Sequence, residues 1–352
     1  MAKAPKKTAA KKAKTTAKKA ASKAVKTTAA ATKAAVKKTA AKKATTQAKK
    51  AVAKTATPKK VGQKKSAAKK DKKITGYGGG GVDVVMSVDQ VAKEAASIAA
   101  NAPTHKELLK LTKNDPLLTI EALRAGYGKM EILHDFTLEV GRGQSLCLIG
   151  PNGAGKSTVL HYIFGFTNIF SGTISIGGKD VTNLTPSQKL AEAGIAYILQ
   201  DKSVFPQMTV EENLLMGGFL KNKPLEAKAA AEMVFDKYSR LAERRDKPAG
   251  VLSGGERRLL EISRALVMNP EVLLVDEPSI GLEPRFIDMV FEILSDLQHK
   301  DGKTIIMVEQ NAKKGLSFAD IGYVLVSGET AIADFGDDLL ENPDVGRLFL
   351  GG

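Results

Sequence analysis

A glycine-rich stretch at residues 150–158, GPNGAGKST, constrains the fold of this chain more than any other feature. It fits the pattern G-x-x-x-x-G-K-[S/T] without a mismatch, through Gly150, Gly155, Lys156 and Ser157. A short apolar segment, SLCLI, precedes the stretch, and TVLHYIFGF, which reads as a helix, follows it. A strand, a glycine loop and a helix in this order predict an α/β domain whose loop binds phosphate.

The residue types in this loop suit a triphosphate with its metal ion. Glycines allow successive backbone N–H groups to turn inward on a phosphate, and the start of the helix adds partial positive charge. Lys156 is expected to reach the β- and γ-phosphates, and Ser157 to place its hydroxyl on Mg²⁺. A glycine-rich turn that binds nothing is disfavoured, because further motifs follow in the order that a nucleotidase needs.

The basic character of the chain is confined to its first 73 residues. Residues 1–73 contain 26 Lys, no Arg and one acidic residue, Asp71, so their charge is about +25, whereas the whole chain carries +16 and the remainder therefore about −9. With almost no large apolar side chains to bury, this tail is predicted to be disordered in isolation. Its composition resembles the tails of linker histones and bacterial histone-like proteins. Contact with nucleic acid, contact with anionic lipid and a plain solubility tail remain open.

Residues 74–116 are predicted to be a linker with a short helix near 87–102, between Ser87 as its cap and Pro103 after its end.

Cys147, the single cysteine, is predicted to be a core residue, and a reducing compartment is the natural expectation. No apolar run approaches the ~18 residues that span a bilayer, and the N-terminus has no signal-peptide h-region.

Residues 117–352 are predicted to form the globular unit. LLTIEAL and EILHDFTLEV are predicted to be strands joined across a turn at 126–128, and SGTISIGG alternates in the way a further strand pair would. Residues 183–202 are predicted to be a helix and then a strand, GIAYILQ, that ends at Gln200. EVLLVDE and KTIIMVEQ are short continuous apolar runs of the kind found in a parallel sheet covered on both sides. Residues 207–265 are predicted to be mostly helical, with Val234, Tyr238 and Leu241 on one helix face.

Two further segments carry chemistry. Asp276 and Glu277 follow four apolar residues, so their carboxylates are expected at the end of a buried strand, where Asp276 is placed for Mg²⁺ and Glu277 for an attacking water. In LSGGE, Ser253 and two glycines precede a helix, which predicts a second anion-binding helix start. Either segment alone would be weak support, since many strands end in acidic residues and many turns are capped by serine.

Taken together, these motifs carry a family resemblance. GPNGAGKST, Gln200 after a strand, LSGGE and LLVDEPS, in this order, resemble the ATP-binding subunit of an ABC transporter. The stretches SVFPQMTVEENLLMGG, DEPSIGLEP, VEQN and NPDVGRLFLGG are similar to the ATPase subunits of branched-chain amino acid importers. The resemblance covers residues 117–352 and implies an ABC-type P-loop ATPase fold: a mixed, largely parallel sheet, an antiparallel β subdomain and a helical subdomain.

The resemblance also implies roles for individual residues. Tyr127 would stack on adenine, while Gln200 would touch Mg²⁺ and the water and couple the site to the membrane partner. The residues that would cradle the phosphates and Mg²⁺ are Gly150, Asn152, Gly153, Gly155, Lys156, Ser157 and Thr158. Gln310 stands at the switch position, where the wider family usually has histidine, and glutamine cannot carry imidazolium charge.

The implied assembly is a head-to-tail dimer that sandwiches two ATP molecules. Ser253 and Gly255 would bind the γ-phosphate of the opposite subunit's ATP, with Asp276 serving the metal and Glu277 the water. The partners would be a second ATP-binding subunit, membrane permease subunits and, indirectly, a solute-binding protein, at the cytoplasmic face of the inner membrane. The alternative is a soluble ABC ATPase that acts on ribosomes or nucleic acid. Such proteins usually have two cassettes in one chain or a long coiled-coil insertion, whereas this sequence has one phosphate loop and one signature. His161, which follows the phosphate loop, is assigned no role.

Overall fold

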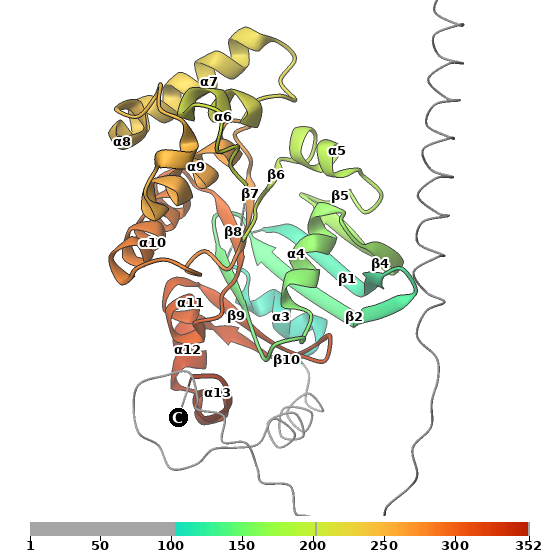
Figure 1. Cartoon of the computed structure of the whole chain (residues 1–352). Helices are drawn as coiled ribbons and strands as arrows, with labels where there is room; N and C mark the ends of the chain where they lie inside the picture. Colours follow the sequence, from blue (N-terminus) through green and yellow to red (C-terminus); the bar gives the residue numbers. More distant parts are fainter. Residues whose placement is uncertain (1–102, 114, 201–202, 351–352) are drawn as a thin grey trace, which may run out of the picture. The chain divides into compact units, whose positions relative to one another are not determined.

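The computed structural model describes residues 103–113, 115–200 and 203–350. The predicted basic tail and the helix expected near residues 87–102 lie outside the described residues. Within the described part, no helix is long and apolar enough to cross a membrane. The fold is α/β with two sheets and a separate group of helices, which confirms the predicted fold class (Figure 1).

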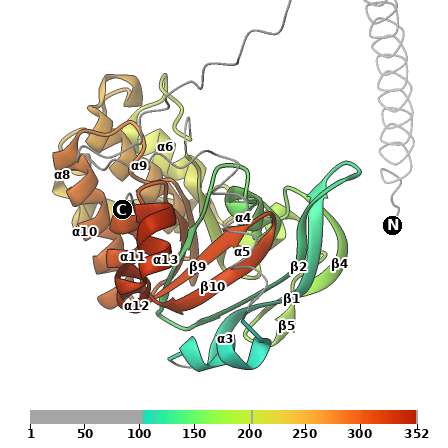
Figure 2. The ribbon, with the colours of Figure 1, turned by 90° about the horizontal axis from the view of Figure 1, so that it is seen from below.

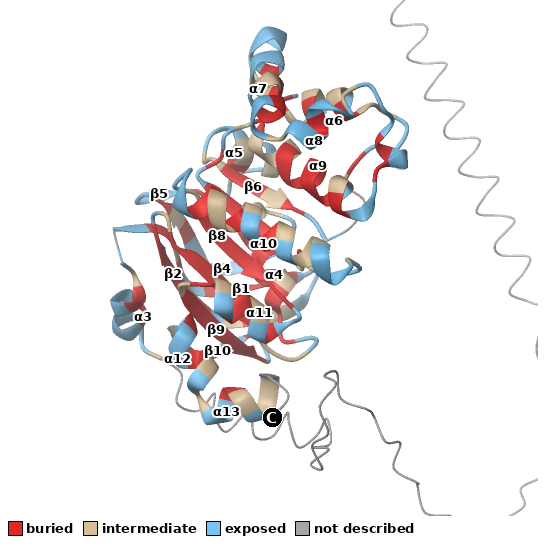
Figure 3. Cartoon of the chain, turned by 90° about the vertical axis from the view of Figure 1, so that its left-hand side faces the viewer, coloured by how far each residue is buried: buried red, intermediate tan, exposed pale blue. Residues whose placement is uncertain are grey.

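The larger sheet has six strands in the order β10-β9-β3-β8-β7-β6. Its strands are β3 (Ser145–Ile149), β6 (Ile195–Ile198), β7 (Val272–Asp276), β8 (Thr304–Val308), β9 (Ile321–Val326) and β10 (Glu329–Phe335). All neighbours are parallel except β9 and β10, which pair antiparallel. Every residue of β3, β7, β8 and β9 is buried (Figure 3). For β7 and β8 this confirms the prediction, made from their continuous apolar runs, of a sheet covered on both faces.

Alternate residues of β3 pack into two different apolar clusters, one on each face of the sheet. Leu146 and Leu148 lie in the cluster that includes α4 (Lys156–Phe164). Cys147 and Ile149 lie in the cluster that includes α10 (Pro284–His299) and α11 (Ala312–Phe318). Burial raises the pKa of the Cys147 thiol, so this cysteine is a small core residue, as the sequence predicts.

The smaller sheet is antiparallel, with the order β2-β1-β4-β5. Its strands are β1 (Pro116–Tyr127), β2 (Met130–Gly141), β4 (Asn168–Ile176) and β5 (Lys179–Asp180). Apolar residues of β1 and β2 share one cluster with α4 and with the inner strands of the larger sheet. The phosphate-loop helix α4 is therefore packed between the two sheets (Figures 1 and 2).

A group of helices forms its own apolar cluster, at the upper left in Figure 1. It contains α6 (Val210–Gly217), α7 (Pro224–Lys237), α8 (Ser239–Ala242), the 3-10 turn η1 (Ala249–Val251) and α9 (Gly254–Leu266). Val234 and Leu241 are buried in this cluster as predicted, but they do not lie on one continuous helix. Tyr238 interrupts it with non-helical backbone angles (φ −125°, ψ 85°) between α7 and α8.

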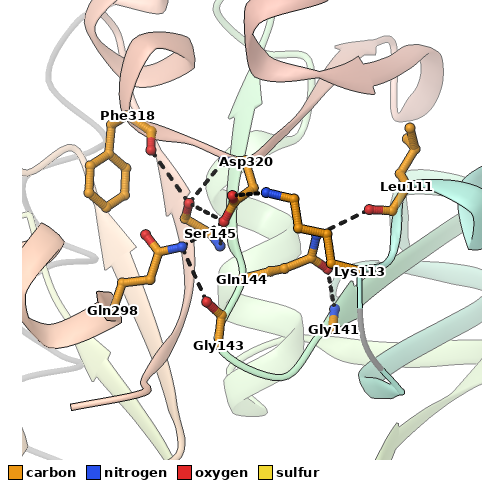
Figure 4. Close-up of polar contacts among 9 residues, drawn as sticks. All are labelled: Leu111, Lys113, Gly141, Gly143, Gln144, Ser145, Gln298, Phe318 and Asp320. Carbon is orange, nitrogen blue, oxygen red and sulfur yellow. Dashed lines mark hydrogen bonds and ion pairs between the residues drawn. The ribbon is translucent and has the colours of Figure 1, made fainter. Parts of the chain in front are cut away.

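Part of the predicted linker belongs to the folded unit. Helix α3 (His105–Leu111) buries Leu108 and Leu111 in the same cluster as β1 and β2. Just after it, Lys113 forms an ion pair with Asp320, at the start of β9 (Figure 4). A linker does not bury leucines in the core, so the boundary predicted between residues 116 and 117 lies too late in the chain.

Asp320 collects hydrogen bonds from three different segments of the chain. Besides Lys113, Ser145 donates to it from its backbone N–H (2.9 Å), and Gln298 donates from Nε2 (2.6 Å) (Figure 4). Burial alone would raise the pKa of Asp320, but the hydrogen bonds from Lys113 and Ser145 outweigh it and hold the pKa below its usual range. The network fixes the start of β3, the strand that leads into the phosphate loop.

A buried lysine caps the far end of the phosphate-loop helix. Lys189, in α5 (Pro186–Ala191), is fully buried and donates from Nζ to the carbonyl oxygens of Ile163 (2.8 Å) and Tyr162 (3.4 Å), near the C-terminus of α4. A cation at this end interacts favourably with the helix dipole. Burial nevertheless lowers the pKa of Lys189 to about 8.

Lys189 predicts a pH dependence of stability. The pKa of Lys189 is about 8 in the folded chain, against an ordinary value of 10.5, which applies to the unfolded chain. Between these pH values the unfolded state therefore binds a proton on Lys189 that the folded state has lost. The free energy of unfolding should therefore rise with pH in this window, by at most about 1.4 kcal/mol per pH unit from this one group. Denaturant titrations of the wild-type chain and of Lys189→Met at pH 7.5–10 measure it. A difference between the two that stays constant over this range contradicts the prediction.

Candidate functional site

Five of the predicted site residues follow or end neighbouring parallel strands at one edge of the larger sheet. Gly150 follows β3, Gln310 follows β8 by two residues, Asp276 ends β7, Glu277 comes next, and Gln200 follows β6 by two residues. The carboxyl ends of parallel strands meet at the same edge, and this edge is where open α/β sheets bind ligands. The tertiary structure thus gathers residues that are up to 160 positions apart in the sequence.

The glycine loop has the backbone geometry that its sequence predicts. Gly150 has φ +142°, and a Cβ there would lie 2.2 Å from the carbonyl oxygen of Leu325. Gly155 has φ +99° and forms the N-cap of α4. Because side chains rarely adopt this conformation, glycine is required at both places. The intervening Asn152 and Gly153 are exposed, whereas Thr158, inside α4, is buried.

Lys156 is drawn back into the loop. It is buried, and its Nζ donates to the carbonyl oxygens of Gly150 (2.9 Å) and Pro151 (3.1 Å). Burial lowers its pKa, while the carboxylates of Glu277 and Asp276 act in the opposite direction. The Lys156 ammonium is thus held at the glycine loop, where a cation is suited to bind phosphate oxygens.

Asp276 and Ser157 lie in direct contact, although 119 residues separate them. The Ser157 hydroxyl donates to Oδ1 of Asp276 (3.1 Å), and the Tyr197 hydroxyl of β6 donates to Oδ2 (2.8 Å). A hydroxyl and a carboxylate side by side are hard oxygen ligands of the kind that Mg²⁺ takes in triphosphate sites, together with phosphates and waters. The donor set therefore fits Mg²⁺.

Glu277 is held from two sides. Nε2 of Gln200 donates to its Oε2 (2.8 Å), and its backbone N–H donates to the carbonyl oxygen of Val308 in β8 (2.9 Å). Its backbone has φ +43°, a strained value for a residue other than glycine. Burial and the neighbouring Asp276 raise the pKa of Glu277 above its usual range, which suits a carboxylate that accepts a proton.

The signature residues lie at the start of α9, in the helical group. Ser253 is the N-cap: its Oγ accepts from the backbone N–H of Glu256 (3.3 Å), and Glu256 in turn accepts from the backbone N–H of Ser253 (2.9 Å). Glutamate at position 256 thus completes a capping box. Among the described residues, no hydrogen bond joins Ser253 or Gly255 to the phosphate loop of the same chain.

His161 is not an isolated surface residue. Its Nδ1 is hydrogen-bonded to the hydroxyl of Tyr127 (2.6 Å), which is 45% exposed at the end of β1. The rings of Phe166 and Tyr197 also lie against His161, at centroid distances of 6.0 and 5.8 Å. An aromatic patch therefore runs from Tyr127 to Tyr197, whose hydroxyl contacts Asp276. The sequence carries no sign of it, because the patch combines three separate segments of the chain, around residues 127, 161–166 and 197.

Arg258 of α9 is a second residue that the motifs do not indicate. It is buried, and it donates from Nη1 to the carbonyl oxygen of Leu199 (2.8 Å) and to Glu261 (2.9 Å). Because Leu199 directly precedes Gln200, Arg258 ties the helical group to the segment that carries Gln200. The only signal in the sequence is that Arg258 lies two residues after the signature, LSGGE.

Comparisons with known proteins agree with this geometry. Residues 133–280 match the family model described as ABC transporter. A branched-chain amino acid transport ATP-binding protein of Pseudomonas aeruginosa, BraG, is 42% identical over 236 residues, which is 67% of this chain and all of that protein. LivF of Archaeoglobus fulgidus, described as a probable branched-chain amino acid transport ATP-binding protein, is 36% identical over 67% of this chain and 99% of that protein.

Solved structures give the same result. A nucleotide-free ATP-binding cassette of an ABC transporter matches with a TM-score of 0.60 and 30% identity, over 67% of this chain and all of that chain. A cassette in its ADP conformation has the same TM-score and identity over 99% of its length. With its phosphate loop, its carboxylates at the ends of parallel strands and this extent of similarity, the chain belongs to the ABC transporter ATP-binding proteins, which hydrolyse ATP.

Proposed function

We propose that this chain is the ATP-hydrolysing subunit of an importer for branched-chain amino acids. The observation that carries the proposal is its 42% identity to BraG over the whole length of that protein. A lipopolysaccharide export ATP-binding protein, LptB of Haemophilus influenzae, is less similar, at 31% identity. Short amides, urea and aromatic acids are the other solutes to compare in a transport assay.

The chemistry follows from the arrangement of the site. Lys156 and the backbone N–H groups of the loop bind the β- and γ-phosphates of ATP, and Ser157 and Asp276 hold Mg²⁺, which when bound neutralises charge on the phosphate oxygens. Glu277 accepts a proton from the water whose oxygen attacks the γ-phosphorus, and Gln200 orients that water. The bond between the γ-phosphorus and the β–γ bridging oxygen breaks, and ADP and inorganic phosphate leave.

The proposed reaction requires a second subunit. Charge on the γ-phosphate is stabilised on one side by the loop of one chain, and Ser253 and Gly255 of a second ATP-binding subunit complete the other side. Tyr127, 45% exposed, offers a ring face to adenine, and Gln310 contacts the γ-phosphate. Closure on ATP and opening after hydrolysis then drive permease subunits that receive solute from a solute-binding protein, with this chain bound peripherally at the cytoplasmic face of the inner membrane.

Gentle solubilisation of membranes tests the proposal. The tagged full chain and a 74–352 variant, which retains α3, are purified, and the proteins that accompany each are identified. A polytopic permease is expected with both forms. Ribosomes or DNA without a permease, and only when the tail is present, would overturn the transport assignment. Reconstitution of the purified complex with its solute-binding protein then compares uptake of labelled leucine with uptake of urea.

For the tail, we propose sequence-independent contact with nucleic acid through its 26 lysines. The full chain is expected to bind duplex DNA of arbitrary sequence at 50 mM salt and to lose roughly three orders of magnitude or more in affinity by 200 mM, because the lysines release counterions. The 74–352 variant should not bind DNA, yet should keep nearly full ATPase activity. Binding to anionic vesicles without binding to DNA would favour lipid contact instead, and loss of ATPase activity would assign the tail to the catalytic unit.

A further inference from the structure

Two loops meet beside the candidate catalytic carboxylate. One follows β7 and carries Glu277 and Ser279; the other follows β8 and carries Glu309 and Gln310. Strands β7 and β8 are parallel neighbours, and the pairing continues one step beyond β7, where the backbone N–H of Glu277 donates to the carbonyl oxygen of Val308 (2.9 Å). The two loops are therefore held side by side from their first residues.

Glu309 forms the second link between these loops. Its Oε1 accepts a hydrogen bond from the hydroxyl of Ser279 (2.7 Å) and another from the backbone N–H of Asn311 (3.0 Å). One carboxylate oxygen thus joins the loop after β7 to the backbone just beyond Gln310. In this loop Glu309 is 1% exposed, whereas the next residue, Gln310, is exposed, so the link lies beneath the exposed Gln310.

The carboxylate of Glu309 is costly to bury for stability alone. Its Oε2 is buried and has no hydrogen-bond partner among the described residues, and no ion pair in that part of the chain includes Glu309. A buried carboxylate without a cation is unfavourable, and its unpartnered oxygen adds to the cost. The link therefore calls for an explanation other than packing.

The backbone of Glu277 supplies that explanation. Its φ of +43° is a conformation that persists only where the surroundings impose it. The bonds that impose it come from Val308 and, two residues further along, from Glu309 through Ser279. The same carboxylate fixes the backbone next to Gln310, so it acts on both loops at once.

We propose that Glu309 is a positioning residue for ATP hydrolysis, which holds the Glu277 loop and the Gln310 loop in one arrangement through Ser279 and the Asn311 backbone. The inference rests on the roles proposed above for Glu277 and Gln310. Glu309 touches neither the attacking water nor the phosphates; it sets the positions of Glu277, which acts on the water, and of Gln310, which contacts the γ-phosphate. Its loss should lower the turnover number rather than the affinity for ATP.

Steady-state ATPase measurements on the full chain test this. Glu309→Ala should lower kcat about tenfold or more, because small displacements of reacting groups are costly, while KM for ATP changes less than about twofold. Glu309→Gln keeps the size and one carbonyl oxygen that can accept both hydrogen bonds, so it should retain at least about half of kcat. Glu341→Ala, an exposed glutamate in α12 (Gly336–Glu341), is the matched control and should behave as wild type.

A double-mutant cycle with Ser279→Ala isolates the link itself. Ser279→Ala should lower kcat about threefold, and the double variant should be no slower than Glu309→Ala within about twofold, because both changes break the same contact. Three results would overturn the inference. The first is a double variant whose loss of kcat equals the product of the two single losses. The others are an unchanged kcat in Glu309→Ala, and a rise in KM of Glu309→Ala instead of a fall in kcat. Glu277→Gln is measured alongside. If Glu277→Gln retains turnover, the roles proposed for the site are wrong. If Glu277→Gln loses turnover but Glu309→Ala does not, only the role of Glu309 is wrong.

Discussion

Replacing Glu277 with glutamine should lower ATP turnover of the full chain about a hundredfold or more, the range that a positioned general base contributes. Glutamine has nearly the same shape and can still accept the hydrogen bond from Gln200 through its carbonyl oxygen, but it cannot take a proton from water. ATP binding should persist, and the ATP-bound dimer should accumulate because it no longer hydrolyses its nucleotide. Phosphate release and size-exclusion chromatography in the presence of ATP measure the two effects.

The same experiment has a clear contrary outcome. Glu341→Gln, an exposed glutamate at the end of α12, makes the same chemical change away from the site and should leave turnover unchanged. Turnover retained in Glu277→Gln would remove Glu277 from the attacking water. Loss of ATP binding in this variant would instead assign Glu277 to binding the nucleotide.

Replacing Gly255 with alanine should destabilise the junction between the signature and α10. A Cβ at Gly255 would lie 2.2 Å from Cδ1 of Phe286, so the ring or the helix start must shift. Overpacking of this kind costs about 1–3 kcal/mol. In a folded unit of this size, each kcal/mol lowers the melting temperature by roughly 2–4 °C. Because α10 follows the loop that carries Ser279, ATP turnover should fall as well.

Its neighbour supplies a matched control. A Cβ at Gly254 would have its nearest contact 3.7 Å away, at Cδ2 of Leu282, which is an ordinary van der Waals distance. Gly254→Ala should therefore leave the melting temperature within about 1 °C of wild type, since alanine is also favourable in a helix. Phe286→Ala added to Gly255→Ala should restore part of the lost stability, as removing the ring removes the clash. Equal melting temperatures for Gly254→Ala and Gly255→Ala would contradict the prediction, because they would show that the start of α9 can shift to fit the added Cβ at no cost in stability.

Several elements could be predicted because their signals are local. The glycine loop, β3 before it and α4 after it are set by backbone conformations and by the alternation of apolar residues over about twenty positions. The buried strands β7 and β8 appear as continuous apolar runs for the same reason. The predicted break between linker and folded unit lies too late, because two buried leucines in a seven-residue helix give too weak a pattern.

Other features escaped the sequence because they depend on which side chains meet. The separation of α7 from α8 at Tyr238 is set by packing in the helical group, and helix propensity alone favours a continuous helix there. Lys189 looks like any exposed lysine of a short helix until the structure places its ammonium group at the end of α4. Burial of charged groups such as Lys189 and Glu309 cannot be read from composition, since such residues are usually exposed.

The sequence by itself determined the fold class, the phosphate loop and the chemical kinds of group at the site, because motif residues act through local backbone geometry and fixed side-chain chemistry. The tertiary structure decided how these groups are held. Ser157 and Tyr197 donate hydrogen bonds to Asp276, whereas Glu277 accepts one from Gln200 and donates one from its backbone to Val308. These contacts join segments up to 119 residues apart. They exist only because parallel strands bring their carboxyl ends to one edge, which is a property of the assembled sheet and not of any single stretch of the chain.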